Sequence, residues 1–242
     1  MVALRLGPLS YELVGARPRF LDPYLVAGVG ARRVEVAVGE GETPVRDASV
    51  TVEAARHRVF LRPGADPERS LHAPLAELAA RDLPEHGALL LHASAVRVAG
   101  GVALLVGPPS VGKTTFARHD PSRAFAGNAA CARRVGGRWR AEALPFASDP
   151  DPDLDARGAE TLVAVVELRR GVEGFEWIPP ARATGLIMRR IGATTLDDPW
   201  RRERALAALD LAASVALASL GVAGRASDLE RLDRSLLASQ RP

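Results

Sequence analysis

The chain has 242 residues, 47% of them hydrophobic, which is enough for one α/β domain with a small additional portion. Its 32 basic and 29 acidic residues give a net charge of +3 and are scattered rather than gathered into a basic patch, so nucleic-acid binding is not indicated. A single cysteine, Cys131, excludes an internal disulfide framework and a multi-cysteine metal site, and we expect it to be a small core residue.

The sequence gives no sign of export or of a membrane-spanning segment. Its first residues lack the charged lead and long apolar stretch of a signal peptide, and no run reaches the about 18 apolar residues of a membrane span. The nearest run, within 206–220, is interrupted by Asp210. We expect a soluble cytoplasmic protein without a membrane partner, and the sequence leaves a homo-oligomer open.

Residues 1–85 are predicted to be rich in β-structure. Apolar and polar side chains alternate over 33–38, which is typical of a half-buried strand, and short β-branched runs follow at 50–52 and 59–61. Glycine- and proline-containing turns lie between or after these runs. The pattern indicates a small sheet.

A helix is predicted next, over about 71–81. Leucines spaced by three or four positions give it one apolar face, and Pro74 is expected to mark its start because proline is tolerated only in the first turn of a helix. We expect this helix and the preceding sheet to pack on a core formed by residues 86–242.

Two strands are predicted just before residue 107. Residues 89–96 form a mostly apolar run that predicts one strand, 97–101 predict a hairpin turn, and 102–106 predict its partner. The second run is continuously apolar, as in a strand buried on both faces. A strand paired so closely with its predecessor is not the usual βαβ opening of a Rossmann-type domain.

Residues 107–115 read GPPSVGKTT and match the phosphate-binding pattern G-x-x-x-x-G-K-[ST]. In such a loop the backbone N–H groups and the following helix N-terminus face nucleotide phosphates, Lys113 reaches the β- and γ-phosphates, and the Thr114 hydroxyl can ligate Mg²⁺. Lys113 is the only lysine, and a planar guanidinium cannot replace its compact ammonium. The alternative is a Gly/Pro-rich turn. The predicted nucleotide-binding residues are Gly107, Pro108, Pro109, Ser110, Val111, Gly112, Lys113, Thr114 and Thr115.

The segments LHASAV at 91–96 and VALLVGPPSVGKTT at 102–115 resemble the HPr kinase/phosphorylase-like kinases, in which a histidine-containing strand precedes the loop. His92 and Gly107 keep the family's fifteen-residue spacing, and a weaker resemblance extends to about residue 232. It implies an α/β fold around a strongly bent sheet with flanking helices. It also implies ATP and Mg²⁺ as cofactors and a serine or threonine hydroxyl of a protein, peptide or small molecule as phosphoryl acceptor.

The chain departs from this family in its carboxylates. The resemblance implies two aspartates at the end of the strand after the loop helix, where this chain has Gly127 and Asn128. An amide oxygen can coordinate a cation, but Asn128 cannot accept a proton at neutral pH. Pro108 replaces an acidic residue of the bifunctional members. These departures leave a second hypothesis open, a catalytically impaired nucleotide-binding pseudokinase that regulates a partner protein.

Two further assignments have two interpretations each. His92 is either a hydrogen-bonded core residue or a catalytic group beside the γ-phosphate. In the second case it joins Lys113 and Asn128, the other two predicted catalytic residues. The four acids within 148–155 form either a solvated loop or a substitute source of a carboxylate, from Asp149 or Asp151. A neighbouring strand ending in aspartate, which an NTPase switch would need, is not evident.

The last third of the chain is predicted to contribute structure. A helix is expected from Asp198 and Pro199 onward, and residues 214–220 are either a strand or the continuation of that helix. Residues 228–236 predict a closing amphipathic helix.

Overall fold

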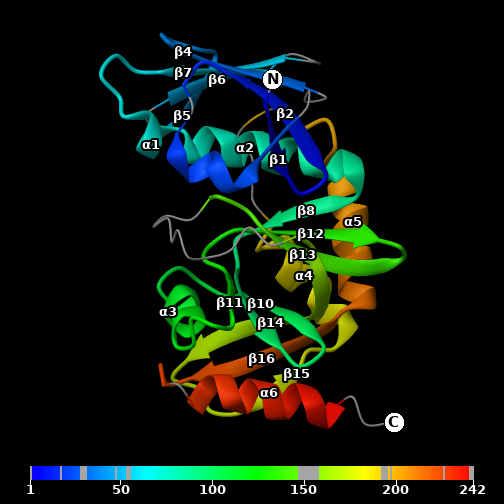
Figure 1. The fold of residues 1–242 in the computed structure, drawn as a ribbon. Helices are drawn as coiled ribbons and strands as arrows, with labels where there is room; N and C mark the ends of the chain where they lie inside the picture. Colours follow the sequence, from blue (N-terminus) through cyan, green and yellow to red (C-terminus); the bar gives the residue numbers. More distant parts are fainter. Residues whose placement is uncertain are drawn as a thin grey trace.

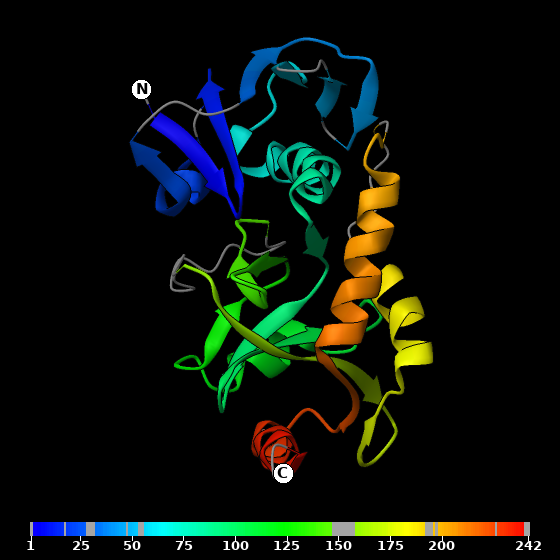
Figure 2. The same ribbon diagram turned by 90° about the vertical axis from the view of Figure 1, so that its right-hand side faces the viewer.

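The chain folds into two mixed sheets with helices between and around them (Figures 1 and 2). The computed structural model describes residues 2–16, 18–27, 32–46, 48–52, 56–146, 158–191, 196, 198–225 and 227–239. The first sheet comes from residues before 62 and the second from residues 88–222. The architecture is therefore mixed α/β, as the sequence predicts.

The first sheet has the strand order β3-β1-β2-β4-β7-β6-β5. The predicted strands at 33–38, 50–52 and 59–61 are confirmed as β4, β6 and β7. The parallel pairing of β2 with β4 and of β4 with β7 is not visible in the sequence. The strands are β1 (Val2–Leu6), β2 (Leu9–Val14), β3 (Leu25–Ala27), β4 (Arg32–Val38), β5 (Thr43–Val45), β6 (Ala48–Val52) and β7 (Arg56–Leu61).

Helix α2 (His72–Asp82) covers this sheet on the side that faces the rest of the chain (Figure 1). It starts two residues before the predicted start at Pro74, which costs no hydrogen bond because the first N–H groups of a helix have no partner within it. Its leucines pack against Ala88, Leu90 and Cys131 of the second sheet as well as against the first. Cys131 is thus confirmed as a core residue. The neighbouring short helices are α1 (Pro67–Ser70) and two 3₁₀ turns, η1 (Arg19–Tyr24) and η2 (Leu83–His86).

The second sheet follows the order β11-β9-β10-β14-β13-β12-β8, with β16 beside β14 and β15 beside β16. Its strands are β8 (Ala88–Leu91), β9 (Ser94–Val98), β10 (Gly101–Val106), β11 (Ala124–Ala126), β12 (Ala130–Val135), β13 (Arg138–Ala143), β14 (Glu160–Arg170), β15 (Phe175–Trp177) and β16 (Ala216–Val222). Five strand spacings would separate β11 from β12 by about 24 Å in a flat sheet. Residues 127–129 join them, and such a link spans at most about 14 Å. The sheet must therefore curl.

The prediction of a single strand over 89–96 is wrong. The run divides at His92 and Ala93 into β8, which pairs with β12, and β9, which pairs with β10 and β11 on the other side of the curled sheet. At the break the His92 N–H donates to the carbonyl oxygen of Arg190 at 2.9 Å. Both halves are apolar because both are buried, so composition alone does not reveal the break.

Helices cover both faces of the second sheet. On one face α4 (Pro180–Met188) and α5 (Arg201–Ser214) run side by side (Figure 2), and against the other pack α3 (Lys113–Arg118) and α6 (Ser227–Ser239). Strand β10 accordingly alternates its side chains between two cores, with Leu104 and Val106 in one and Ala103 and Leu105 in the other. The expectation of a strand buried on both faces is confirmed.

The alternatives for the C-terminal third are decided by β16. It runs parallel to β14 and pairs residues 216–222 with 164–170, so 214–220 does not continue α5, and the helix ends at Ser214. The closing helix is confirmed as α6. The acidic residues at 148–155 lie outside the described residues. In the described part of the chain no helix is long and apolar enough to cross a membrane.

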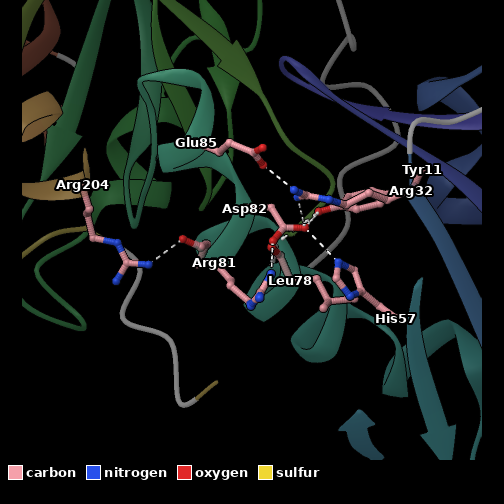
Figure 3. A network of polar contacts seen from close by, with 9 residues as sticks. Tyr11, Arg32, His57, Leu78, Arg81, Asp82, Glu85 and Arg204 are labelled. Atoms are coloured by element: carbon pink, nitrogen blue, oxygen red, sulfur yellow. Dashed lines mark hydrogen bonds and ion pairs between the residues drawn. The ribbon is translucent and has the colours of Figure 1, made fainter. Parts of the chain in front are cut away.

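A buried polar network joins α2 to the first sheet (Figure 3). Asp82 has no exposed surface, and its carboxylate accepts from the Tyr11 hydroxyl at 2.9 Å and from His57 Nε2 at 3.0 Å. Arg32 forms an ion pair with the same carboxylate at 2.8 Å. Nearby, Arg204 of α5 donates to the Ala80 carbonyl oxygen at 2.8 Å. The network and this contact tie α2 to both sides of the molecule. The predicted boundary between 85 and 86 falls in η2, between the two sheets, and stays a prediction.

Candidate functional site

The phosphate-loop sequence lies between β10 and α3, in the strand, loop, helix order that the sequence predicts. Two positions favour glycine. A Cβ on Gly107 would lie 2.8 Å from Val111 Cγ1, and Gly112 has φ +102°, in the left-handed region. Ser110 also has a positive φ, 60°. The loop therefore turns tightly back over the N-terminus of α3.

The Lys113 side chain folds back over this loop. The residue is 6% exposed, and Nζ donates to the carbonyl oxygens of Gly107 and Pro108 at 3.3 Å each. Burial lowers the pKa of the ammonium, and the positive charge of Arg190 lowers it further. Neutral carbonyl oxygens compensate a buried cation only in part, whereas phosphate oxygens would do so fully.

Thr114 links α3 to the end of β11. Its hydroxyl donates to the Gly127 carbonyl oxygen at 3.3 Å, and the Ser94 hydroxyl donates to the same oxygen. The residue pair Gly127 and Asn128 is thereby held against the N-terminus of α3, where the resemblance places two aspartates. The hydroxyl oxygen of Thr114 keeps lone pairs for a cation.

These residues surround one cavity of about 470 Å³, here called the loop cavity. It brings together residues far apart in the sequence, including His92 from the break between β8 and β9 and Asn128 from the β11–β12 link. Of the predicted residues, Gly107, Pro108 and Val111 do not line it. The lining residues are His92, Pro109, Ser110, Gly112, Lys113, Thr114, Thr115, Asn128 and Arg170.

His92 is exposed on the cavity wall, so the interpretation as a core residue is wrong. Partial loss of solvent lowers the pKa of its imidazole, and the positive charges of Lys113 and Arg190 lower it further. Both effects favour the neutral ring. Among the residues that line the loop cavity, His92 is the group suited to accept a proton near neutral pH.

Three charged residues near the cavity were not predicted from the sequence. Glu167 of β14 pairs in parallel register with Val106, directly before the loop, and its carboxylate contacts Arg169 at 2.9 Å and Arg190 at 3.9 Å. The sequence could have indicated Glu167, because it is an acid near the end of the apolar run 162–168. Arg170, whose Nε donates to the Val111 carbonyl oxygen at 3.2 Å, and Arg190 had no signal, because arginines occur throughout the chain.

The donor set near the loop suits Mg²⁺ only as a partner of phosphate. No group of three or more His, Cys, Asp or Glu side chains that could hold a metal exists among the described residues. A Mg²⁺ ion at this site would depend on the Thr114 hydroxyl, phosphate oxygens and water, which is the usual arrangement for this hard cation at nucleotides.

Comparison with known proteins gives a weak likeness. No family model matches the chain. No curated protein matches it either. Among solved structures, the HPr(Ser) kinase/phosphatase from Coxiella burnetii is similar with a TM-score of 0.36 and 14% sequence identity, over 63% of this chain and 90% of that chain. The chain is therefore described by its own features, as a mixed α/β protein with a phosphate-loop sequence on the wall of a cavity.

Proposed function

We propose that this chain binds ATP with Mg²⁺ at residues 107–115 and transfers the γ-phosphoryl group to a serine or threonine hydroxyl of a protein, peptide or small molecule. The observation that carries the proposal is the buried Lys113 ammonium, folded over the loop and open to a cavity that also holds His92. An HPr-kinase-like core in residues 86–242, with 1–85 packed on it, is part of the proposal.

The binding half of the proposal follows from charge. Loop N–H groups and the N-terminus of α3 would face the β-phosphate, and Lys113 would exchange its carbonyl partners for phosphate oxygens. Bound Mg²⁺ would neutralise phosphate charge, with the Thr114 hydroxyl as its protein ligand. Arg170 adds a further cation on the cavity wall.

The chemical half assigns the proton to His92. The acceptor oxygen forms a bond to the γ-phosphorus while the bond from that phosphorus to the bridging oxygen of ADP breaks. The hydroxyl proton passes to a neutral ring nitrogen of His92. Asn128, on the same wall, can hold an oxygen in place through its amide N–H groups but cannot take the proton.

A second candidate function is a nucleotide-binding regulatory partner without phosphoryl transfer. The observation that favours it is the cavity wall itself, where the described lining residues include Asn128 and no carboxylate. In this case ATP binding would control association with another protein.

Turnover of Mg²⁺-ATP by the wild type and by Asn128→Asp distinguishes the two functions. A kinase with a weakened site is expected to turn over slowly, and the added carboxylate should raise the rate by about 10-fold or more, whereas Asn128→Ala should not. ATP binding without turnover in the wild type would overturn the kinase and leave the regulatory partner.

The pH dependence of turnover tests the role of His92. A base must be neutral, and the pKa of His92 lies below the usual value of 6.5, so the rate is expected to fall on the acid side with a midpoint below pH 6.5. His92→Gln should lower kcat about 100-fold and remove this fall. The exposed His86 serves as control, because His86→Gln should preserve the profile. An unchanged profile in His92→Gln would exclude His92 as the base.

A further inference from the structure

A second cavity adjoins the loop cavity. It has a volume of about 270 Å³ and lies between α3 and the C-terminal ends of β14 and β16. Neither the sequence pattern nor the resemblance assigns a role to it. We call it the side cavity.

The two cavities meet at three shared residues, Gly112, Thr115 and Arg170. His92 and Asn128 line the loop cavity alone. A nucleotide whose terminal phosphate faces those two residues would extend its other end past Thr115 into the side cavity. The charge at the junction fits this direction. The guanidinium of Arg170 lies close to Gly112, since a Cβ on that glycine would be 3.7 Å from Nη2. An α-phosphate that passes from one cavity to the other would therefore meet this guanidinium.

The walls of the side cavity suit a flat, largely apolar group. Phe116 and Val222 contribute apolar surface, and Gly171 and Gly224 contribute backbone without side chains. Ligand pockets usually combine apolar walls with few polar groups, and about 300 Å³ is the lower end of their size range. The volume is enough for one nucleoside rather than for a large substrate.

One wall is also rigid. The carboxylate of Asp228, a residue that is 3% exposed, accepts the backbone N–H groups of Ala223, Gly224 and Arg225 at 3.0 to 3.1 Å. The loop after β16 is thereby held in place without a ligand. A preformed wall lowers the entropy cost of binding.

One residue that lines the side cavity carries a buried polar atom without a partner in the described part of the chain. His119, directly after α3, lines it, and the buried Nε2 of its ring has no hydrogen-bond partner among the described residues. A buried polar atom without a partner costs free energy, which a ribose hydroxyl or a base nitrogen would recover if the ring turned this atom into the cavity.

We propose that the side cavity binds the nucleoside half of the nucleotide, a flat heteroaromatic base with its ribose, while the loop cavity binds the phosphates. The inference rests on the proposed nucleotide binding and adds the part of the ligand that the phosphate-loop sequence does not address. Its consequence is that the nucleoside, and not the phosphate chain alone, determines affinity.

Calorimetric titration of the wild type with Mg²⁺-ATP and with Mg²⁺-tripolyphosphate tests this inference. ATP is expected to bind at least about 10-fold more tightly than tripolyphosphate, because a base enclosed by the protein contributes about this much affinity. Equal affinities would overturn the nucleoside site and leave phosphate binding intact. Binding of neither ligand would overturn both proposals.

A variant pair locates the nucleoside. Ala223→Trp places a large ring at the exposed wall of the side cavity and keeps the N–H that Asp228 accepts, so ATP affinity should fall about 10-fold or more while tripolyphosphate affinity stays unchanged. Val172→Trp adds the same ring to a residue 51% exposed and outside the lining, and should change neither. An unchanged ATP affinity in Ala223→Trp, or an equal loss for both ligands, would contradict the assignment.

Discussion

Lys113→Ala is expected to weaken binding of Mg²⁺-ATP by about 100-fold or more, because charge-assisted hydrogen bonds to phosphate are among the strongest single contacts in such a site. The alanine also leaves the Gly107 and Pro108 carbonyl oxygens without their donor, which repels phosphate rather than attracting it. The measurement is the dissociation constant from calorimetric titration at fixed Mg²⁺, alongside a thermal unfolding curve that checks the fold.

Two further variants sharpen this experiment. Lys113→Arg keeps the charge, but the position is buried and its acceptors are close, so the wider planar guanidinium should restore little of the affinity. Arg138→Ala removes an exposed cation from β13 and should have no effect. Full affinity in Lys113→Ala would show that the loop does not hold the phosphates.

Asp82→Asn is expected to lower the free energy of unfolding by about 3 to 5 kcal/mol, the usual result of removing one partner from a buried ion pair. The amide keeps the shape of the side chain but leaves the Arg32 guanidinium without its buried counter-charge and His57 with a weaker acceptor. Urea unfolding at pH 7 measures the loss. Glu85→Gln is the matched control, since Glu85 pairs with the same arginine but is 31% exposed, and its removal should cost less than about 1 kcal/mol.

The same network predicts a pH dependence of stability. Burial alone would raise the pKa of Asp82, but the hydrogen bond and charge of His57 and the charge of Arg32 outweigh it and lower the pKa from 3.8 to about 2. A lowered pKa stabilises the folded state above the unfolded value. The stability difference between wild type and Asp82→Asn should therefore be complete above about pH 4 and shrink as the pH falls towards 2. A difference that does not change over this range would contradict the role of the Asp82 charge.

The local elements of this fold follow from short segments of sequence. The phosphate loop occupies nine contiguous residues with required glycines, so its place between a buried strand and a helix is readable directly. Strands β4, β6 and β7 and the helices α2 and α6 likewise follow from spacing of apolar residues over a single element.

The parts that escaped prediction depend on how strands pair across the chain. The break at His92 exists because the chain crosses from one side of the curled sheet to the other, and an apolar run gives no signal of that crossing. Glu167 comes near the loop because β14 runs parallel to β10, and Arg190 comes near it through a backbone contact with His92. Such proximity is a property of topology, which a single sequence does not encode locally.

Calorimetric titration of the full chain with Mg²⁺-ATP tests whether residues 107–115 hold ATP. We expect saturable binding at one site, with a dissociation constant below about 1 mM that Lys113→Ala raises by about 100-fold or more. Absence of binding by the folded wild type, or equal binding by wild type and Lys113→Ala, would contradict it.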